Sequence, residues 1–408
     1  MKFIDNVDIK RYHEFESYNK KSHFLQSYEW GLFCKKAKGQ VPVYVGMEND
    51  LGNLVATCLI LLRKTPLGYS YGYAPRGFIL DYSDKEVIKE FTNYLKEYMK
   101  QNKIIYIKFD PDIKYQDIDE DGKRVDGGEN NYELYNYMLS LGYKHTGFYR
   151  LYEGNQPRYT FRINLKKPWE EIEAKFNKSF MKSVKRSYSY NLIVDNEVRV
   201  HDFYCLIESN SSKDGFDPHS EEYYKIFSEE MSKDNNMKYF NISIRPKELL
   251  DNINKEIDDL SKELEVNKKK EADIKNKIAR LEKEREVFSG IDKDEVCVCS
   301  LICTYTKTRA WSLYIGSDDL ANFTFAVTRS YYEAIKDAYD KGYEFFDLFG
   351  TPGDPHTKYK NLAKLHDFKR KFGDEYIEFI GEFDLVNNKL LYKMLPVMLK
   401  VYRKLRRK

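Results

Sequence analysis

The sequence has few cysteines and no paired cysteine motif. Its six cysteines include no Cys-x-x-Cys spacing, which argues against a disulfide framework and against a metal site built on such pairs. Cys297, Cys299 and Cys303 lie in or beside a strand-like stretch, where buried free thiols are the simpler interpretation. We therefore expect no metal site, and a reducing compartment such as the cytoplasm.

Long apolar stretches are also missing. No run of 18 apolar residues occurs, so no ordinary membrane-spanning helix is expected. Asp5, Asp8 and Glu14 interrupt the amino-terminal region, where a signal peptide would need an apolar core. These absences again favour a cytoplasmic location.

Several motifs of catalysis and cofactor binding are absent. The sequence contains no Gly-x-Gly-x-x-Gly motif, no P-loop and no evident Ser/His/Asp or Cys/His set. The Arg/Gln-x-x-Gly-x-Gly/Ala loop that holds the pyrophosphate of coenzyme A is missing from both halves. We therefore expect no cofactor and no enzyme nucleophile.

A strong excess of charge is absent overall but present at the carboxyl end. The net charge is only +3, yet residues 389–408 hold eight Lys or Arg and no acid, interleaved with apolar residues. Such a basic amphipathic segment suits an anionic membrane surface at the inner face of the membrane. A helix docked on its own domain with a basic end is the alternative, and both interpretations can hold together.

What is present is enough material for two domains of mixed α/β structure. The chain has 408 residues and 15% aromatic residues, more than one ordinary core requires. The first half predicts helices and strands over residues 8–18, 41–47, 54–62, 69–73, 85–100 and 104–109. Ser27 is the expected cap of a second short helix, and Phe91 and Leu95 lie on the apolar side of the helix over residues 85–100. The second half repeats the order over residues 159–165, 169–190, 202–211, 220–233, 239–244, 296–305, 309–314, 323–341 and 345–349. This internal duplication predicts two tandem acetyltransferase-like domains.

The stretch between residues 246 and 289 follows a different pattern. An apolar seam with steps of 3, 4, 3 and 4 is formed by Leu250, Ile253, Ile257, Leu260 and Leu264. It fails at Asn267, Lys268 and Glu271 and resumes with Ile274, Ile278, Leu281 and Phe288. Two short halves favour an antiparallel coiled-coil hairpin of roughly 27 Å at 1.5 Å per residue. One continuous helix that dimerises is the alternative.

These patterns define the expected domain boundaries. The first acetyltransferase-like domain comprises residues 1–150, with residues 377–408 packing back on it. The second comprises residues 151–245 and 290–376. The coiled-coil arm, residues 246–289, is inserted into the second domain and offers a surface for self-association.

Two clusters of cations are candidates for binding and catalysis. Lys178, Lys182, Lys185 and Arg186 follow helical spacing, and three of them share a face able to meet the phosphates of a nucleic acid. A solvated helix face is the simpler alternative. Lys369 lies in the run Phe368-Lys369-Arg370-Lys371-Phe372, where a cation held among aromatics would stabilise a developing oxyanion.

Asp110 is the candidate acid. It ends a predicted strand just before Pro111, and ligands of α/β sheets gather at the carboxyl ends of strands. A carboxylate there would act as a base or as an orienting acceptor. Turn formation at Asp-Pro is the structural alternative.

The order of several short motifs resembles the Fem/MurM (FemABX) aminoacyltransferases along essentially the whole chain. The motifs are Leu25-Gln26-Ser27-Tyr28-Glu29-Trp30, Pro75-Arg76-Gly77, Lys108-Phe109-Asp110-Pro111, Phe345-Phe346-Asp347-Leu348-Phe349-Gly350 and Phe368-Lys369 through Ile380-Gly381-Glu382. Members with an arm carry it in the second acetyltransferase-like domain. These enzymes move an amino acid from aminoacyl-tRNA to the side-chain amine of residue 3 in a peptidoglycan precursor stem, which builds the interpeptide bridge.

The resemblance implies a role for individual residues. Asp110 and the pair Phe368 and Lys369 match the catalytic acid and the Phe-Lys pair at the tRNA acceptor end. The implied precursor-binding residues are Arg76, His219 (where an Arg is expected), Tyr223, Tyr314 and, because Cys34 occupies the usual lysine position, Lys35 or Lys36. The basic helix with Lys178, Lys182, Lys185 and Arg186 is assigned to tRNA.

The expected function is therefore a tRNA-dependent aminoacyltransferase acting on lipid II or the soluble UDP-linked pentapeptide. Its partners are aminoacyl-tRNA, the lipid-linked precursor and the membrane surface. The sequence does not choose among Gly, Ala and Ser as the transferred residue. A coenzyme A-dependent N-acyltransferase and a non-catalytic coiled-coil binding protein are the alternatives, and the missing pyrophosphate loop argues against the former.

Overall fold

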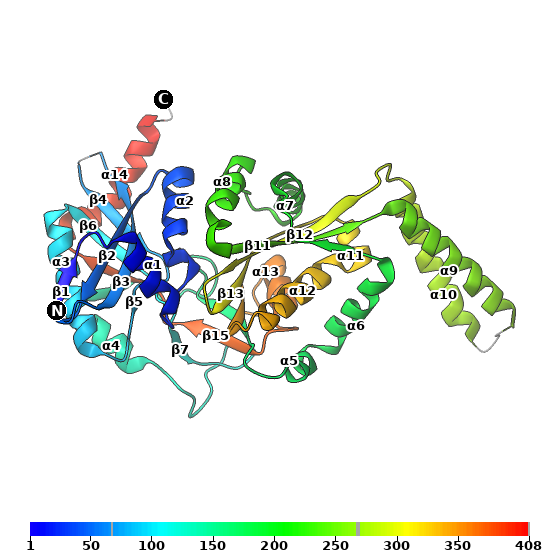
Figure 1. Ribbon diagram of the computed structural model, residues 1–408, viewed down its shortest axis with the longest axis horizontal. Coiled ribbons are helices and arrows are strands. Elements are labelled where there is room, and N and C mark those ends of the chain that lie inside the picture. Colours follow the sequence, from blue (N-terminus) through cyan, green and yellow to red (C-terminus); the bar gives the residue numbers. More distant parts are fainter. Residues whose placement is uncertain (67, 267–269, 407–408) are drawn as a thin grey trace.

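The computed structural model describes residues 1–66, 68–266 and 270–406. Its strands form two mixed sheets of eight strands each, which occupy the two halves of an elongated molecule (Figure 1). The predicted seam break at Asn267 and Lys268 lies outside the described residues. None of the described helices is long and apolar enough to cross a membrane.

The first sheet, with the helices around it, is called here the first half. Its strand order is β1-β2-β3-β4-β6-β16-β8, with β5 paired to β3. The strands are β1 (Lys2–Ile4), β2 (Val41–Glu48), β3 (Leu54–Lys64), β4 (Ser70–Ala74), β5 (Ile79–Leu80), β6 (Ile104–Phe109), β8 (Tyr143–His145) and β16 (Phe383–Val386). The helices are α1 (Ile9–Tyr18), η1 (Phe24–Gln26), α2 (Tyr28–Lys38), α3 (Lys85–Gln101), α4 (Tyr132–Ser140) and α14 (Lys389–Arg406).

The second sheet and its helices form the second half. Its strand order is β10-β11-β12-β13-β14-β9-β15-β7. The strands are β7 (Lys114–Asp117), β9 (Tyr159–Asn164), β10 (Ile193–Asp195), β11 (Met237–Ile244), β12 (Val296–Tyr305), β13 (Arg309–Ser317), β14 (Phe345–Thr351) and β15 (Glu375–Phe379). The helices are α5 (Trp169–Lys175), α6 (Lys178–Ser187), η2 (Tyr188–Tyr190), α7 (Val200–Asp214), α8 (Glu221–Met231), η3 (Lys233–Asn235), α11 (Leu320–Thr324), α12 (Ala326–Asp340) and α13 (Lys360–Lys369).

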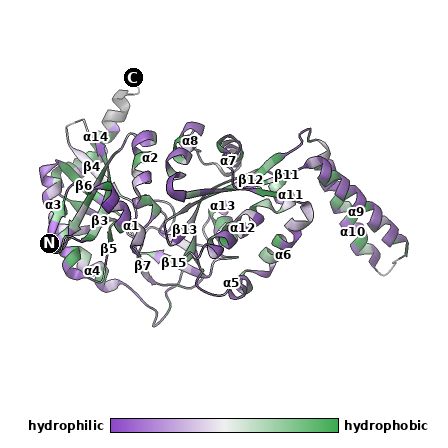
Figure 2. Ribbon diagram, viewed as in Figure 1, coloured by the Kyte–Doolittle hydropathy of each residue, from purple (hydrophilic) through white to green (hydrophobic). Residues whose placement is uncertain are grey.

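Each half contains one parallel strand pair joined by a helix. β4 and β6 are parallel and are connected through α3, and β13 and β14 are parallel and are connected through α12. A parallel pair needs such a crossover. The same unit in both halves agrees with the duplication expected from the order of elements, and Figure 2 shows hydrophobic residues concentrated in the strands of both sheets.

Local capping signals set several helix boundaries. Ser27 Oγ accepts from the backbone N–H of Trp30 at 3.1 Å, which confirms the predicted cap of α2. The helix predicted over residues 169–190 is instead broken at Phe176, whose backbone is extended, and α6 starts anew with Asn177 as its cap. The helix predicted over residues 323–341 is likewise divided at Phe325, which has a φ of 59°.

The two halves exchange strands and share a core. β7, from within residues 1–150, pairs with β15 at the edge of the second sheet, and β16 then returns the chain to the first sheet. A buried cluster joins α2 to α8: Trp30 and Phe33 pack against Tyr223 and Phe227. The halves are therefore held together by a continuous apolar contact.

Residues 246–266 and 271–289 form two helices that lie side by side and project from the far end of the second half (Figure 1). These are α9 (Pro246–Val266) and α10 (Glu271–Ser289), which connect the antiparallel neighbours β11 and β12. Ile253, Ile257 and Leu260 are buried in one cluster with Ile274 and Leu281. An ion pair of 2.7 Å between Lys277 and Glu256 also links the two helices.

Candidate active site

Asp110 lies at the carboxyl end of the parallel pair β4–β6. Only 2% of its surface is exposed. Its Oδ1 accepts from the backbone N–H of Arg76 at 2.8 Å, and its Oδ2 accepts from the Tyr73 hydroxyl at 3.0 Å. The end of β4 and the turn that follows it therefore supply the two donors, because the two parallel strands end at the same edge of the sheet.

Burial raises the pKa of Asp110 to about 7, and the nearby Glu382 carboxylate adds to this rise, whereas the Arg76 guanidinium opposes it. A carboxyl with such a pKa exchanges a proton near neutral pH. It is therefore suited to accept a proton from a bound amine or to orient that amine.

Arg76 joins the turn after β4 to the second half. Its Nη2 donates to the Pro157 carbonyl at 2.6 Å, and its guanidinium lies 4.1 Å from the centre of the Phe379 ring. Arg76 is 5% exposed. The guanidinium is thus largely engaged within the protein, and its predicted contact with a substrate requires these interactions to loosen.

A buried ionic cluster lies next to Asp110 and was not predicted from the sequence. The Arg162 guanidinium donates to both Asp112 oxygens, at 2.7 and 2.8 Å, and to Asp347 at 2.7 Å. Burial alone would raise the pKa of Asp112, but Arg162 and Arg309 outweigh it and hold that pKa well below its ordinary value. The one available signal was that Asp347 falls in a motif at the expected strand β14; its partner Arg162 lies directly opposite on β9.

A small cavity lies between Arg76, which contacts Asp110, and the pair Phe349 and Gly350, which contact Lys369. It has a volume of about 10 Å³, enough for about one water molecule. Its lining is His23, Arg76, Tyr159, Thr160, Trp311, Asp347, Phe349, Gly350 and Phe379. Because this volume is too small for a substrate, a substrate enters only if some of these side chains move.

Lys369 lies behind the wall of this cavity. Its Nζ donates to the carbonyls of Phe349 at 3.2 Å and Gly350 at 2.8 Å, and both of these residues line the cavity. Burial lowers the pKa of Lys369 to about 7, against the opposing effect of Asp347. Its neighbour Phe368 packs on Tyr331 in the core of the second half, with ring centres 5.5 Å apart.

A second group of predicted residues meets where α2 faces α8. The hydroxyls of Tyr223 and Tyr314 lie 3.0 Å apart, and the His219 ring stacks on Tyr223 with ring centres 3.8 Å apart. Although His219 as a residue is exposed, this stacking partly buries its ring and lowers its pKa, and Lys38 lowers it further. His219 is therefore mostly neutral at pH 7.

The cation beside this aromatic group is Lys38, which the sequence analysis did not name. Its Nζ lies 5.0 Å from the Trp30 ring centre and 5.6 Å from that of Tyr223. Lys36 instead pairs with Glu230 at 2.5 Å, and Lys35 is exposed. The signal for Lys38 was its spacing on α2, four residues after Cys34, at the position that shares its helix face.

The basic residues of α6 divide into two sets. Lys178, Lys182 and Lys185 are exposed, and no ion pair to them is found among the described residues. Arg186 instead pairs with Glu284 of α10 at 3.3 Å, and its guanidinium lies 4.9 Å from the Phe325 ring centre. The three lysines are thus available to a polyanion, whereas Arg186 anchors the arm.

The similarity to known proteins extends over nearly the whole chain. The model of the FemAB family matches residues 7–400. Two Lipid II:glycine glycyltransferases, from Staphylococcus epidermidis and Staphylococcus aureus, are each 26% identical; both alignments cover 99% of this chain and 98% and 99% of those proteins. The crystal structure of FemX shares the fold, with a TM-score of 0.77 and 24% identity over 97% of this chain and 99% of FemX. Since the family model spans almost every residue, the chain belongs to the FemAB family.

Proposed function

We propose that this protein is an aminoacyltransferase that takes glycine from glycyl-tRNA and attaches it to the side-chain amine of residue 3 in the lipid-linked peptidoglycan precursor, at the cytoplasmic face of the membrane. The observation that carries this proposal is the end-to-end similarity to relatives named Lipid II:glycine glycyltransferase. Those names also favour glycine over alanine and serine.

The chemistry agrees with the residues around the cavity. Aminolysis of an ester needs a neutral amine held near the carbonyl and a stabilised oxyanion, but no enzyme nucleophile. Asp110, with a pKa of about 7, orients the incoming amine. Lys369, with a pKa also of about 7, stabilises the oxyanion in its ammonium form.

The two substrates approach from different surfaces. The precursor lies between α2 and α8, where Lys38 meets its phosphates and Tyr223, His219 and Tyr314 contact the rest. The tRNA lies on α6, whose exposed Lys178, Lys182 and Lys185 meet its backbone phosphates. Each half acts as one acetyltransferase-like unit, and α9 and α10 act as an antiparallel coiled-coil arm on the second.

The test is transfer in a defined mixture. Purified protein is incubated with lipid II and with glycyl-, alanyl- or seryl-tRNA carrying a labelled amino acid, and the labelled lipid product is measured. Glycine transfer is expected to dominate. No transfer from any aminoacyl-tRNA, together with acyl transfer from an acyl-coenzyme A, would overturn the proposal.

A matched pair of variants tests the precursor surface. Lys38→Gln is expected to raise the KM for lipid II about tenfold, because a charge-assisted contact to phosphate is lost. Lys35→Gln removes an exposed lysine of the same helix and is expected to leave the KM unchanged. Equal effects of both substitutions would argue against the assignment of Lys38.

A further inference from the structure

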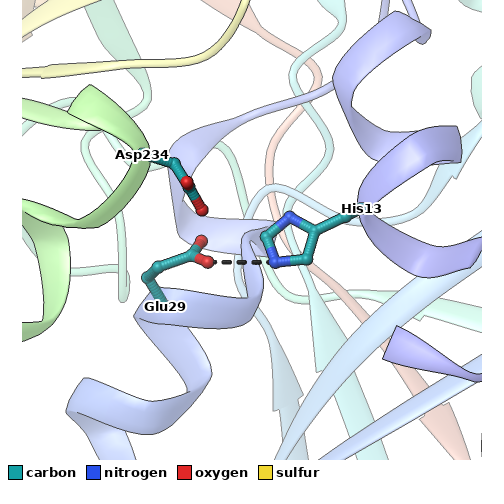
Figure 3. Close-up of side chains that lie close together, drawn as sticks. All are labelled: His13, Glu29 and Asp234. Carbon is teal, nitrogen blue, oxygen red and sulfur yellow. Dashed lines mark ion pairs between the residues drawn. The ribbon is translucent and has the colours of Figure 1, made fainter. Parts of the chain in front are cut away.

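Three side chains of metal-ligand type meet at the junction of the two halves, away from the cavity described above (Figure 3). His13 comes from α1, Glu29 from α2, and Asp234 from η3, which follows α8. His13 Nε2 lies 3.0 Å from Glu29 Oε1. One ligand atom from each of the three residues lies within 4.8 Å of the other two.

The spacing is close to that of a coordinated ion. Ligand bonds of 2.0–2.2 Å in tetrahedral geometry place the ligand atoms about 3.4 Å apart. The His13–Glu29 pair already meets this spacing. Asp234, in η3, is exposed and has a φ of 53°, so its carboxylate has freedom to close the remaining gap of at most about 1.4 Å.

A second, independent feature points to a cation at this place. Glu16, on α1, is only 6% exposed, and no donor among the described residues forms a hydrogen bond or an ion pair with its carboxyl. It lines the same surface pocket as His13, Asp234 and Lys307. Burial and the Glu29 carboxylate raise the pKa of Glu16 to about 8. Glu16 thus offers a further carboxyl oxygen to a cation bound in this pocket.

We propose that His13, Glu29 and Asp234 bind one divalent metal ion, with Glu16 as the neighbouring carboxylate. An imidazole nitrogen together with carboxylate oxygens favours Zn²⁺ or Mn²⁺ over Mg²⁺ and Ca²⁺, which prefer oxygen ligands alone. The ligands come from both halves, so the ion joins α1 and α2 to the segment after α8. It therefore fixes the spacing of the surface on which Lys38 and Tyr223 meet.

The experiment measures binding and stability and does not depend on transfer activity. The full-length protein is freed of metal with a chelator and titrated by calorimetry with Zn²⁺, Mn²⁺, Mg²⁺ or Ca²⁺, and its Tm is recorded with each. One Zn²⁺ or Mn²⁺ per chain and a dose-dependent rise in Tm are expected, with no comparable effect of Mg²⁺ or Ca²⁺. Absence of stoichiometric Zn²⁺ and Mn²⁺ binding would overturn the proposal, and binding without a rise in Tm would overturn the joining role.

Substitutions locate the ion. Asp234→Asn removes one charged ligand at an exposed position where Asn tolerates the positive φ, so the variant is expected to fold. His13→Gln removes the nitrogen ligand. Each is expected to weaken Zn²⁺ binding about 100-fold, at least as much as the loss of a group that only supports a ligand.

The chain offers a matched control. His201 Nδ1 lies 2.8 Å from Glu221 in an exposed pair, with Cys205 Sγ 3.7 Å from the other ring nitrogen. His201→Gln is expected to leave the affinity and the stoichiometry unchanged. Loss of binding in His201→Gln but not in Asp234→Asn or His13→Gln would assign the ion to that surface pair and overturn the proposal.

Discussion

The titration of Asp110 should make the stability of the whole protein depend on pH. In the folded chain Asp110 keeps its proton up to about pH 7, whereas its ordinary pKa is 3.8. The folded state therefore binds more protons between these values, and wild-type stability decreases as the pH rises through that interval.

Asp110→Asn should remove this decrease. The substitution keeps the shape and an acceptor for the Arg76 N–H, but it has no charge to desolvate. Relative to wild type, the variant should gain on the order of 4 kcal/mol in free energy of unfolding between pH 4 and pH 8. Denaturant unfolding at the two pH values measures this difference, and parallel pH dependence in both proteins would contradict the assigned burial effect.

The same variant separates two roles in transfer. We expect Asp110→Asn to lower the rate at every pH, because the carboxylate positions the amine. A base would behave differently: wild type would lose activity below about pH 7, and this limb would be missing from the pH–rate profile of the variant. Rates measured from pH 5.5 to pH 9 distinguish these outcomes.

Lys369→Ala should lower kcat by about 100-fold, or about 3 kcal/mol, with little change in KM, because an oxyanion contact acts only in the transition state. The pKa of Lys369 falls from 10.5 to about 7, so the ammonium form predominates only below pH 7. The ratio of wild-type to variant kcat should accordingly be largest below pH 7 and shrink above it. Lys364→Ala, an exposed position on α13, is the control; a pH-independent ratio would point to a purely structural role for Lys369.

The arm contains many lysines, and four of its basic residues are already paired with acids. Lys247, Lys275, Lys277 and Arg280 pair with nearby acids, whereas the three lysines of α6 have no ion pair within the described part of the chain. We therefore expect α6 to contribute more to tRNA binding than the arm. The triple substitution Lys178→Gln, Lys182→Gln and Lys185→Gln should lower the salt slope of tRNA binding by about one for each lost contact.

Replacing residues 256–277 with a short Gly-Ser linker is the complementary test. It keeps the Arg186–Glu284 contact and joins two positions that are neighbours through the Glu256–Lys277 ion pair. Both halves should stay folded, and tRNA affinity should fall less than in the triple α6 variant. A larger fall would identify the arm as the main tRNA-binding element. A decrease in solution mass greater than that of the deleted residues would show that the arm mediates self-association.

Helix α14 presents an apolar face that its own domain leaves uncovered. Leu390, Met394 and Val397 are 68%, 47% and 66% exposed and follow one face of the helix, while the Tyr392 hydroxyl anchors the helix to Asp384 at 2.6 Å. Gln at all three exposed positions should lower binding to vesicles with anionic lipid and spare transfer to a soluble precursor. Unchanged vesicle binding would show that this face of α14 does not contact the membrane.

Local sequence patterns predicted the elements that depend on neighbouring residues. The cap at Ser27 and the apolar face of α3, with Phe91 and Leu95 buried, are encoded within a few residues of each helix. The short strands β7, β15 and β16 were not predicted, because each is stabilised by partners far along the chain, such as Phe383 opposite Phe109. Pairing between residues so far apart in the chain leaves no periodic pattern in the local sequence.

For the same reason, only part of the candidate site could be predicted from the sequence. Asp110 was identified from its place at the end of a strand, and Tyr223 from the family resemblance. Arg162 was missed because its partners Asp112 and Asp347 are 50 and 185 residues away. Ionic clusters that join two halves become visible only when the halves are placed together.

The cavity draws its lining from His23 at one extreme of the sequence and Phe379 at the other. During synthesis the chain leaves the ribosome from its amino end, so the cavity wall cannot close until Phe379 has emerged. The first half meanwhile lacks β16, one of its inner strands. The nascent chain thus exposes an incomplete sheet edge until β16 has emerged, and it is in this interval that a chaperone would find most to bind.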